Sequence, residues 1–154
     1  MREIIKICLY GKNEDLVKEV SDFKKDFKTQ DPEIIAENKG MKGYGKYVLG
    51  DKWKKGTPFH VKSAVVYNNF IKKFGLEGKY KLLTSGEKIK LIAVNKNSIF
   101  DNSMVAFTTP IPKEMDLKNQ VNYEQQWQKI FVMPLRKITD VLGWNIEPKR
   151  KKLF

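Results

Sequence analysis

The chain has 154 residues, of which 41% are hydrophobic and 12% aromatic, a composition that supports a folded domain and excludes an intrinsically disordered chain. It contains 30 Lys or Arg against 18 Asp or Glu, a net charge of +12, which argues for a polyanionic partner. The single cysteine excludes an internal disulfide framework and indicates a reducing compartment. No apolar run is long enough to span a bilayer and no signal-peptide cleavage site follows the N-terminal stretch, so neither a membrane helix nor a membrane partner is expected.

Two helices are predicted within the first 30 residues. The first covers residues 2–10, where apolar residues share one side. The second covers residues 14–28: Asn13 suits its N-cap, acidic residues occupy the positive first turn, and an apolar stripe follows at helical spacing.

A third helix is predicted after a segment rich in glycine and lysine. That segment, residues 37–56, is expected to be mainly loop. Thr57 then suits an N-cap and Pro58 the first helical position, and the helix continues over residues 58–74 with an apolar stripe.

Two strands and a long last helix complete the prediction. Residues 88–94 alternate in hydrophobicity, and Met104–Phe107 forms a second short apolar strand. A helix capped by Asn122 is expected over residues 122–142, and Pro134 should kink or break it. Its apolar face contains Trp127, Ile130, Phe131, Leu135, Ile138, Val141 and Leu142.

These elements predict an α+β fold, mainly helical, with three longer helices and a small antiparallel sheet. The apolar faces of the three longer helices are expected to pack together as one core. Residues 1–144 would form the domain, and residues 145–154 a basic C-terminal tail.

The positive charge is concentrated in the middle of the chain. Residues 37–62 and residues 72–96 each carry seven basic and two acidic residues, so these two blocks hold +10 of the net +12. A general bias toward lysine explains the total but not this clustering. Clustered lysines neutralise phosphates, so the pattern favours contact with a nucleic acid.

Three other features suggest chemistry and have simpler explanations. Residues 40–46 have the spacing of a phosphate-binding P-loop, but Tyr47 stands where Ser or Thr should hold magnesium, which favours a flexible loop bearing lysines. His60 has no Cys, Asp or Glu at ligand spacing, so a phosphate contact and a packing role both remain open. Cys8 lies on an apolar helix face and is expected to be a core residue.

No pair of carboxylates stands at a spacing that suits acid–base or two-metal catalysis. This chain alone is therefore not expected to catalyse a reaction.

Several short motifs follow one another along the chain. They are Gly45–Gly50, Pro58–Val61, Val66–Asn68, Ser85–Ile89, Met104–Phe107 and Tyr123–Leu135. In order and spacing they resemble the thumb region and C-terminus of family B replicative DNA polymerases of T-even-like bacteriophages, over about residues 2–145. The resemblance implies a thumb that grips newly made duplex across its minor groove, mostly through phosphates.

The catalytic parts of that family lie in a palm and an exonuclease domain that precede the thumb, and their Asp-Thr-Asp and Lys-Lys-x-Tyr motifs are absent from this chain. Because Met1 opens the chain where the thumb would begin, the resemblance suggests a split polymerase, or alternatively a fragment of a longer gene. No cofactor is then expected in this chain, and Mg2+ would be bound by a separate catalytic N-terminal polypeptide. A protein of phage origin would act in the host cytoplasm.

The family also ends in a short apolar peptide that binds the sliding clamp. Leu153 and Phe154 resemble a shortened form of it, and a frayed terminus is the simpler alternative.

A groove for primer–template duplex is the expected site. The residues expected to line it are Lys39, Lys42, Lys46, Lys54, Lys55, His60, Lys62, Lys88 and Lys90. Two alternatives remain: a stand-alone basic nucleic-acid-binding accessory protein, and an adaptor that only tethers a polymerase to its clamp.

Overall fold

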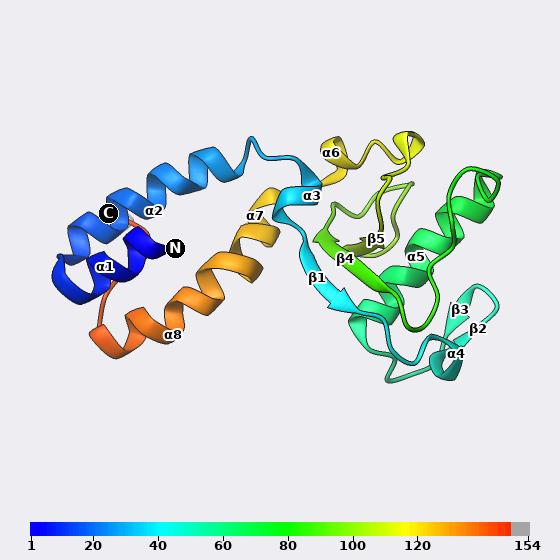
Figure 1. Ribbon diagram of the computed structural model, residues 1–154, viewed down its shortest axis with the longest axis horizontal. Coiled ribbons are helices and arrows are strands. Elements are labelled where there is room, and N and C mark those ends of the chain that lie inside the picture. Colours follow the sequence, from blue (N-terminus) through cyan, green and yellow to red (C-terminus); the bar gives the residue numbers. More distant parts are fainter. Residues whose placement is uncertain (149–154) are drawn as a thin grey trace, which may run out of the picture. The chain divides into compact units, whose positions relative to one another are not determined.

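The computed structural model describes residues 1–148, which form two compact units (Figure 1). The helical unit consists of residues 1–30 together with residues 124–148. The sheet unit consists of Asp31–Tyr123. The helical content and the small antiparallel sheet confirm the predicted α+β class.

The helical unit packs helices from the two ends of the described chain around an aromatic core. Its elements are α1 (Arg2–Tyr10), α2 (Asn13–Phe27), α7 (Tyr123–Trp127, which begins at the last residue of the sheet unit), a π-helical segment (Gln128–Val132) and α8 (Met133–Leu142). Trp127 is fully buried, and its ring stacks on Phe131 with 4.2 Å between centroids. Phe23 and Phe27 pack against the same indole at 5.6 and 5.1 Å, so α2 and α7 share this core.

Pro134 does not break the last helix. A proline has no N–H to give to the carbonyl four residues earlier, so the α-helical ladder must change near it. Here the change takes the form of the π-helical segment, in which the N–H of Met133 donates to the carbonyl of Gln128, five residues back. The helix then continues as α8 with Pro134 in its first turn, so of the predicted kink or break, the break is wrong.

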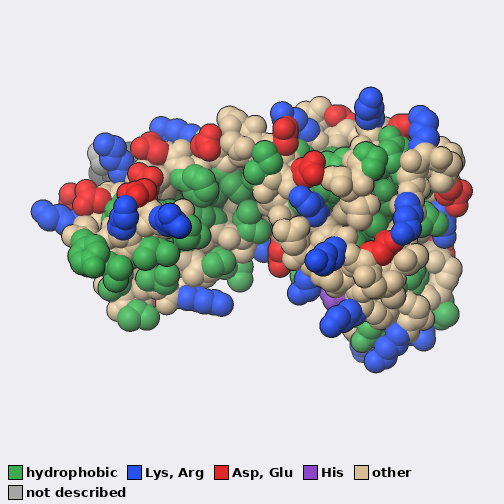
Figure 2. Space-filling view, in the orientation of Figure 1, with side chains coloured by type: hydrophobic (Ala, Val, Ile, Leu, Met, Phe, Trp, Pro, Cys, Tyr) green, Lys and Arg blue, Asp and Glu red, His purple; other side chains and the backbone are tan. Residues whose placement is uncertain are grey.

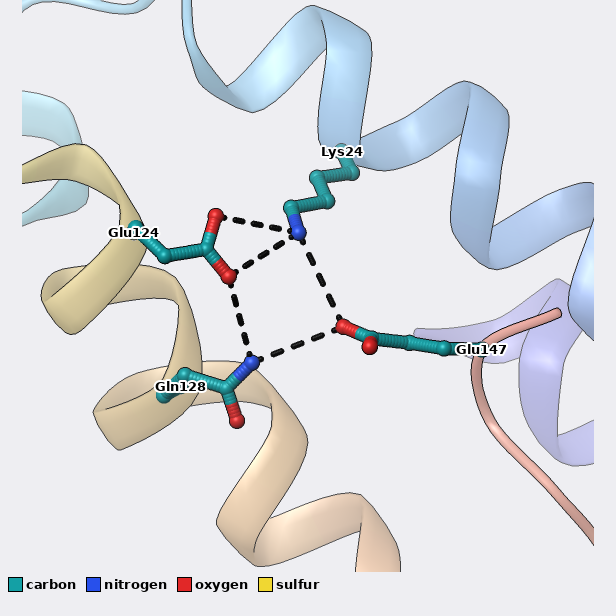
Figure 3. Close-up of polar contacts among 4 residues, drawn as sticks. All are labelled: Lys24, Glu124, Gln128 and Glu147. Carbon is teal, nitrogen blue, oxygen red and sulfur yellow. Dashed lines mark hydrogen bonds and ion pairs between the residues drawn. The ribbon is translucent and has the colours of Figure 1, made fainter. Parts of the chain in front are cut away.

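The residues that follow α8 return to α2 and are held there by polar contacts. The Lys24 ammonium lies 3.0 Å from a carboxylate oxygen of Glu124 and 3.6 Å from one of Glu147 (Figure 3). The Gln128 amide donates to both carboxylates, at 3.4 and 3.5 Å. The Lys24 ammonium is also the main reason that the pKa of Glu124 is lowered. The network ties α2, α7 and the C-terminal segment together.

The sheet unit places a long helix against a three-stranded sheet. Its elements are α3 (Pro32–Ile35), β1 (Glu37–Gly40), α4 (Tyr44–Tyr47), β2 (Val48–Leu49), β3 (Lys52–Trp53), α5 (Phe59–Lys73), β4 (Lys88–Ala93), β5 (Met104–Phe107), a 3-10 turn (Lys113–Met115) and α6 (Leu117–Gln120). The antiparallel sheet has the order β1-β4-β5, and β2 and β3 form a separate hairpin. α5 packs against this sheet through β5.

Both predicted strands are confirmed as β4 and β5, but the segment expected to be loop is more ordered than its composition suggests. It contains β1, α4 and the β2–β3 hairpin. The start of α5 also differs from the prediction by one residue. Pro58 precedes the helix at the N-cap position, and the Thr57 hydroxyl donates to the carbonyl of Lys54 instead of capping the helix. Similarly, Asn13 is the first residue of α2 rather than its cap.

The prediction of one shared core is wrong, because α5 belongs to the sheet unit while α2 and α7–α8 belong to the helical unit. The predicted burial of the last helix is also wrong at its C-terminal end, where Ile138, Val141 and Leu142 are 43%, 85% and 41% exposed.

Cys8 is half-buried rather than a core residue, and burial raises the pKa of its thiol. None of the helices formed by residues 1–148 is long and apolar enough to cross a membrane.

Candidate nucleic-acid interface

Among the residues that the structure describes, the net positive charge lies mainly in the sheet unit. Residues 31–123 contain 16 Lys or Arg and nine Asp or Glu, a net charge of +7. The described residues of the helical unit contain ten and nine, a net charge of +1. All of the residues predicted to contact DNA belong to the sheet unit, so one compact body carries the whole candidate surface.

Four of the predicted lysines lie on the segment between β1 and α5, and all four are exposed: Lys42, Lys46, Lys54 and Lys55. The backbone N–H of Lys54 donates to the carbonyl of Tyr47 at 3.0 Å, and its ammonium donates to the carbonyl of Lys46 at 3.2 Å. The ammonium of Lys46 lies 5.3 Å from the Tyr47 ring centre. The fold therefore brings Lys46 and Lys54 together on α4 and the hairpin.

The β2–β3 hairpin reverses at Gly50 and Asp51, because Leu49 pairs with Lys52. Gly50 has φ +62, a left-handed conformation that glycine adopts without the steric cost of a side chain. This turn sets the position of the lysines that follow β3.

A buried asparagine holds this segment against the turn that leads into β4. Asn68, on α5, is only 3% exposed. Its amide N–H group donates to the Tyr44 hydroxyl and to the carbonyl of Leu83, both at 2.9 Å, and its carbonyl accepts the N–H of Leu83 at 2.8 Å. The N–H of Tyr44 donates to the Ser85 hydroxyl at 2.9 Å. The basic segment is therefore anchored to the core by hydrogen bonds.

Three further predicted residues meet near the N-terminus of α5. The Lys39 ammonium on β1 lies 6.0 Å from the ring centre of Phe59, and the Phe59 and His60 rings are 5.9 Å apart. Lys62 is half-buried in the same first turn. The buried Nε2 of His60 has no hydrogen-bond partner within residues 1–148. Figure 2 shows basic side chains next to this histidine on the surface of the sheet unit, all of them lysines because residues 31–123 contain no arginine.

The two lysines of β4 lie apart from Lys39. In the antiparallel register Lys39 is opposite Ile89, while Lys88 and Lys90 are opposite Gly40 and Asn38. Side chains alternate along a strand, so Lys88 and Lys90 project from the other face of the sheet. The Lys90 ammonium also donates to the carbonyl of Glu33 on α3, at 3.0 Å. The structure therefore places Lys39 on the face of the sheet opposite to that of Lys88 and Lys90.

Sequence reasoning missed two residues that the structure makes prominent. Asn68 is a polar residue inside an otherwise apolar helical stripe, which was the available signal for a buried hydrogen-bonding role. Trp53 is an aromatic residue within a run of lysines and lines a pocket beside α5. An aromatic residue among lysines is a pattern typical of nucleic-acid contact.

Other predicted features remain outside what the structure tests. Within residues 1–148, no three His, Cys, Asp or Glu side chains are grouped so that they would hold a metal ion. Leu153 and Phe154, the expected clamp-binding residues, lie outside the described residues.

Comparison with known proteins finds a distant similarity to a DNA polymerase. No protein-family model matches it. Over 155 aligned positions, it is 25% identical to a DNA-directed DNA polymerase of Enterobacteria phage T4. The match covers 97% of this chain but 17% of that polymerase, so the chain spans about one sixth of the length of the curated relative. The chain is therefore distantly similar, over nearly its whole length, to one region of a phage DNA polymerase.

Proposed function

We propose that the chain is the thumb part of a replicative DNA polymerase, which grips primer–template duplex through phosphate contacts and completes the enzyme together with a separate catalytic polypeptide. The observation that carries this proposal is the similarity of 97% of the chain to a DNA-directed DNA polymerase. The +7 charge of the sheet unit supports it independently, because phosphate neutralisation supplies most of the affinity of sequence-independent DNA binding.

The duplex grip is assigned to those of the predicted DNA-contacting lysines that lie around α4, directly after the hairpin and at the start of α5. Phosphate contacts carry no base identity, which suits an enzyme that must hold every template sequence equally. Lysine supplies a point charge on a flexible stem. The stems start from a backbone that Asn68 and the hairpin hydrogen bonds hold in place, which limits the entropy lost on binding.

Binding of the catalytic polypeptide is assigned to two exposed apolar stripes of the helical unit, one on α1 and one on α8, together called the docking face. It consists of Ile5, Leu9, Ile138, Val141 and Leu142, each between 41% and 85% exposed. Ile5 and Leu9 are one turn apart on α1, and Ile138 and Val141 are one turn apart on α8, so each helix presents a stripe. Figure 2 shows hydrophobic side chains gathered on the surface of the helical unit. Exposed apolar patches of this kind are typical of protein interfaces.

The rest of a polymerase is the occupant that best fits this face. The matched polymerase contains about five times more chain than the matched region, which leaves a large protein to be bound. A second copy of this chain is a poorer occupant, since two molecules of charge +12 repel one another. The stand-alone accessory protein is not favoured by the polymerase similarity, and no observation favours the tethering adaptor.

Reconstitution tests the proposal. The chain is mixed with the matching catalytic polypeptide, and primer extension is measured with and without it as the salt concentration is raised. We expect the chain to increase processivity. For about five neutralised phosphates, log duplex affinity should fall with log salt at a slope of roughly −4 to −5. A slope near zero, or no effect on extension, contradicts the proposal.

A further inference from the structure

A pocket in the sheet unit lies outside the set of residues assigned to the duplex. It encloses about 530 Å3 between the β2–β3 hairpin, the C-terminal half of α5 and the loop that follows β4. This volume is within the range of small-ligand sites. Its lining includes Trp53, Lys52, Phe70, Lys73, Asp51 and Asp101.

The walls of the pocket are held together by hydrogen bonds. The side-chain amide of Asn69 on α5 donates to the carbonyl of Asp51 at 3.0 Å, which joins the helix to the hairpin. Within the loop that follows β4 and supplies Ser98, Ile99 and Asp101 to the lining, the Asn97 side-chain carbonyl accepts the N–H groups of Ile99 and Phe100 at 2.8 and 3.0 Å. The pocket is therefore formed before a ligand binds, which reduces the ordering cost of binding.

Its chemistry combines aromatic surface with charges of both signs. Trp53 is 36% exposed, and Phe70, only 4% exposed, is also part of the lining. None of the ion pairs found within residues 1–148 involves Lys52, Lys73, Asp51 or Asp101. The two ammonium groups suit phosphates, while carboxylates suit the amino and imino N–H groups at the edge of a nucleobase.

We propose that this pocket binds one unpaired base of single-stranded DNA, which stacks on Trp53 while the flanking phosphates contact Lys52 and Lys73. A base inside a duplex is stacked on both faces and cannot enter a pocket, whereas an unpaired base offers a free π-face. Stacking on an aromatic side chain beside cationic groups is the common mode of single-strand binding. The inference goes beyond the duplex grip and does not depend on it.

The test compares two single-stranded oligonucleotides of equal length, one normal and one in which the central nucleotides are abasic. Both carry the same phosphates, so a difference in affinity reports on the bases alone. By fluorescence anisotropy, we expect the complete chain to bind the normal strand about ten-fold more tightly. Trp53→Ala should remove that preference, whereas Tyr10→Ala, which removes an exposed aromatic residue of α1, should keep it.

A second variant keeps the test valid if Trp53→Ala does not fold. Trp53→Phe retains a ring for stacking, so it should keep the preference but lose the quenching of tryptophan fluorescence by the normal strand. Equal binding of the two strands by the wild-type chain, a preference that survives Trp53→Ala, or equal quenching in Trp53→Phe overturns the proposal.

Duplex binding separates this inference from the proposed function. We expect Trp53→Ala to change duplex affinity by less than two-fold. A wild-type chain that prefers the normal strand but does not bind duplex would contradict the duplex grip and leave the pocket assignment standing. A wild-type chain that binds duplex but shows no base preference would contradict the pocket assignment and leave the duplex grip standing.

Discussion

The side-chain amide of Asn68 and the backbone of Leu83 exchange two hydrogen bonds, 2.8 and 2.9 Å long, in the interior of the sheet unit. This pairing has the form of a strand ladder, with a side chain in place of one strand. The same amide N–H group also reaches the Tyr44 hydroxyl, so one residue of α5 organises two surface segments.

Replacing Asn68 with Ala should destabilise the sheet unit, because the N–H and carbonyl of Leu83 would be left buried without these partners. We expect the free energy of unfolding to fall by roughly 2–4 kcal/mol. Asn69→Ala is the matched control, since it removes one hydrogen bond at a half-exposed position and should cost about 1 kcal/mol or less. Urea denaturation of both variants measures the difference, and equal losses would argue against the anchoring role.

Replacing Lys54 and Lys55 together with Ala should weaken duplex binding for all template sequences alike. Two lost phosphate contacts should make the slope of log affinity against log salt less negative by about 2. The double variant Lys18→Ala with Lys25→Ala removes the same charge from exposed positions on α2, and it should leave that slope nearly unchanged. A loss confined to one template sequence would contradict contact with phosphates.

Replacing Leu9 and Val141 with Glu should disrupt binding of the catalytic polypeptide while leaving duplex binding intact. These side chains are 67% and 85% exposed, so the substitutions should not unfold the helical unit. We expect at least a ten-fold loss in a pull-down or calorimetric titration, because carboxylates would enter an apolar interface. Ile34→Glu, at a residue 68% exposed in the sheet unit, is the control and should bind normally.

Stability of the sheet unit should fall in acid partly through Glu87. Its carboxylate pairs with the Lys81 ammonium and accepts the N–H of Thr84 at 3.1 Å, and the Lys81 contact is the main reason that its pKa is lowered from 4.5. A lowered pKa stabilises the folded state above the pKa of the unfolded chain, and this contribution is lost as pH falls through the folded value.

Glu87→Gln should therefore have a lower Tm than the wild type at pH 7, and the gap should close below about pH 4.5. Thermal unfolding of both proteins from pH 7 to pH 3 measures this difference in Tm. A gap that stays constant over this range would show that the carboxylate charge contributes nothing.

Local patterns were sufficient for the longer helices and for the two apolar strands of the chain. Apolar spacing predicted α2 and α5, alternation predicted β4, and a short apolar run predicted β5, because these signals depend on neighbours within a few residues. The same reasoning failed for β1. Its sequence, Glu37 to Gly40, has no strand pattern, and it becomes a strand because β4 supplies hydrogen-bond partners from about 50 residues away.

For the candidate site too, some features follow from the sequence and others only from the fold. The amino-acid sequence by itself determined that positive charge is concentrated between residues 37 and 96, since charge depends only on composition. Only the tertiary structure decided which of those charges share a surface. Pairing across the sheet separates Lys39 from Lys88 and Lys90, and packing of the hairpin on α5 makes a pocket at Trp53. Likewise, the apolar stripe of α8 is visible in the sequence, but its exposure depends on what packs against it, which is a property of the folded chain.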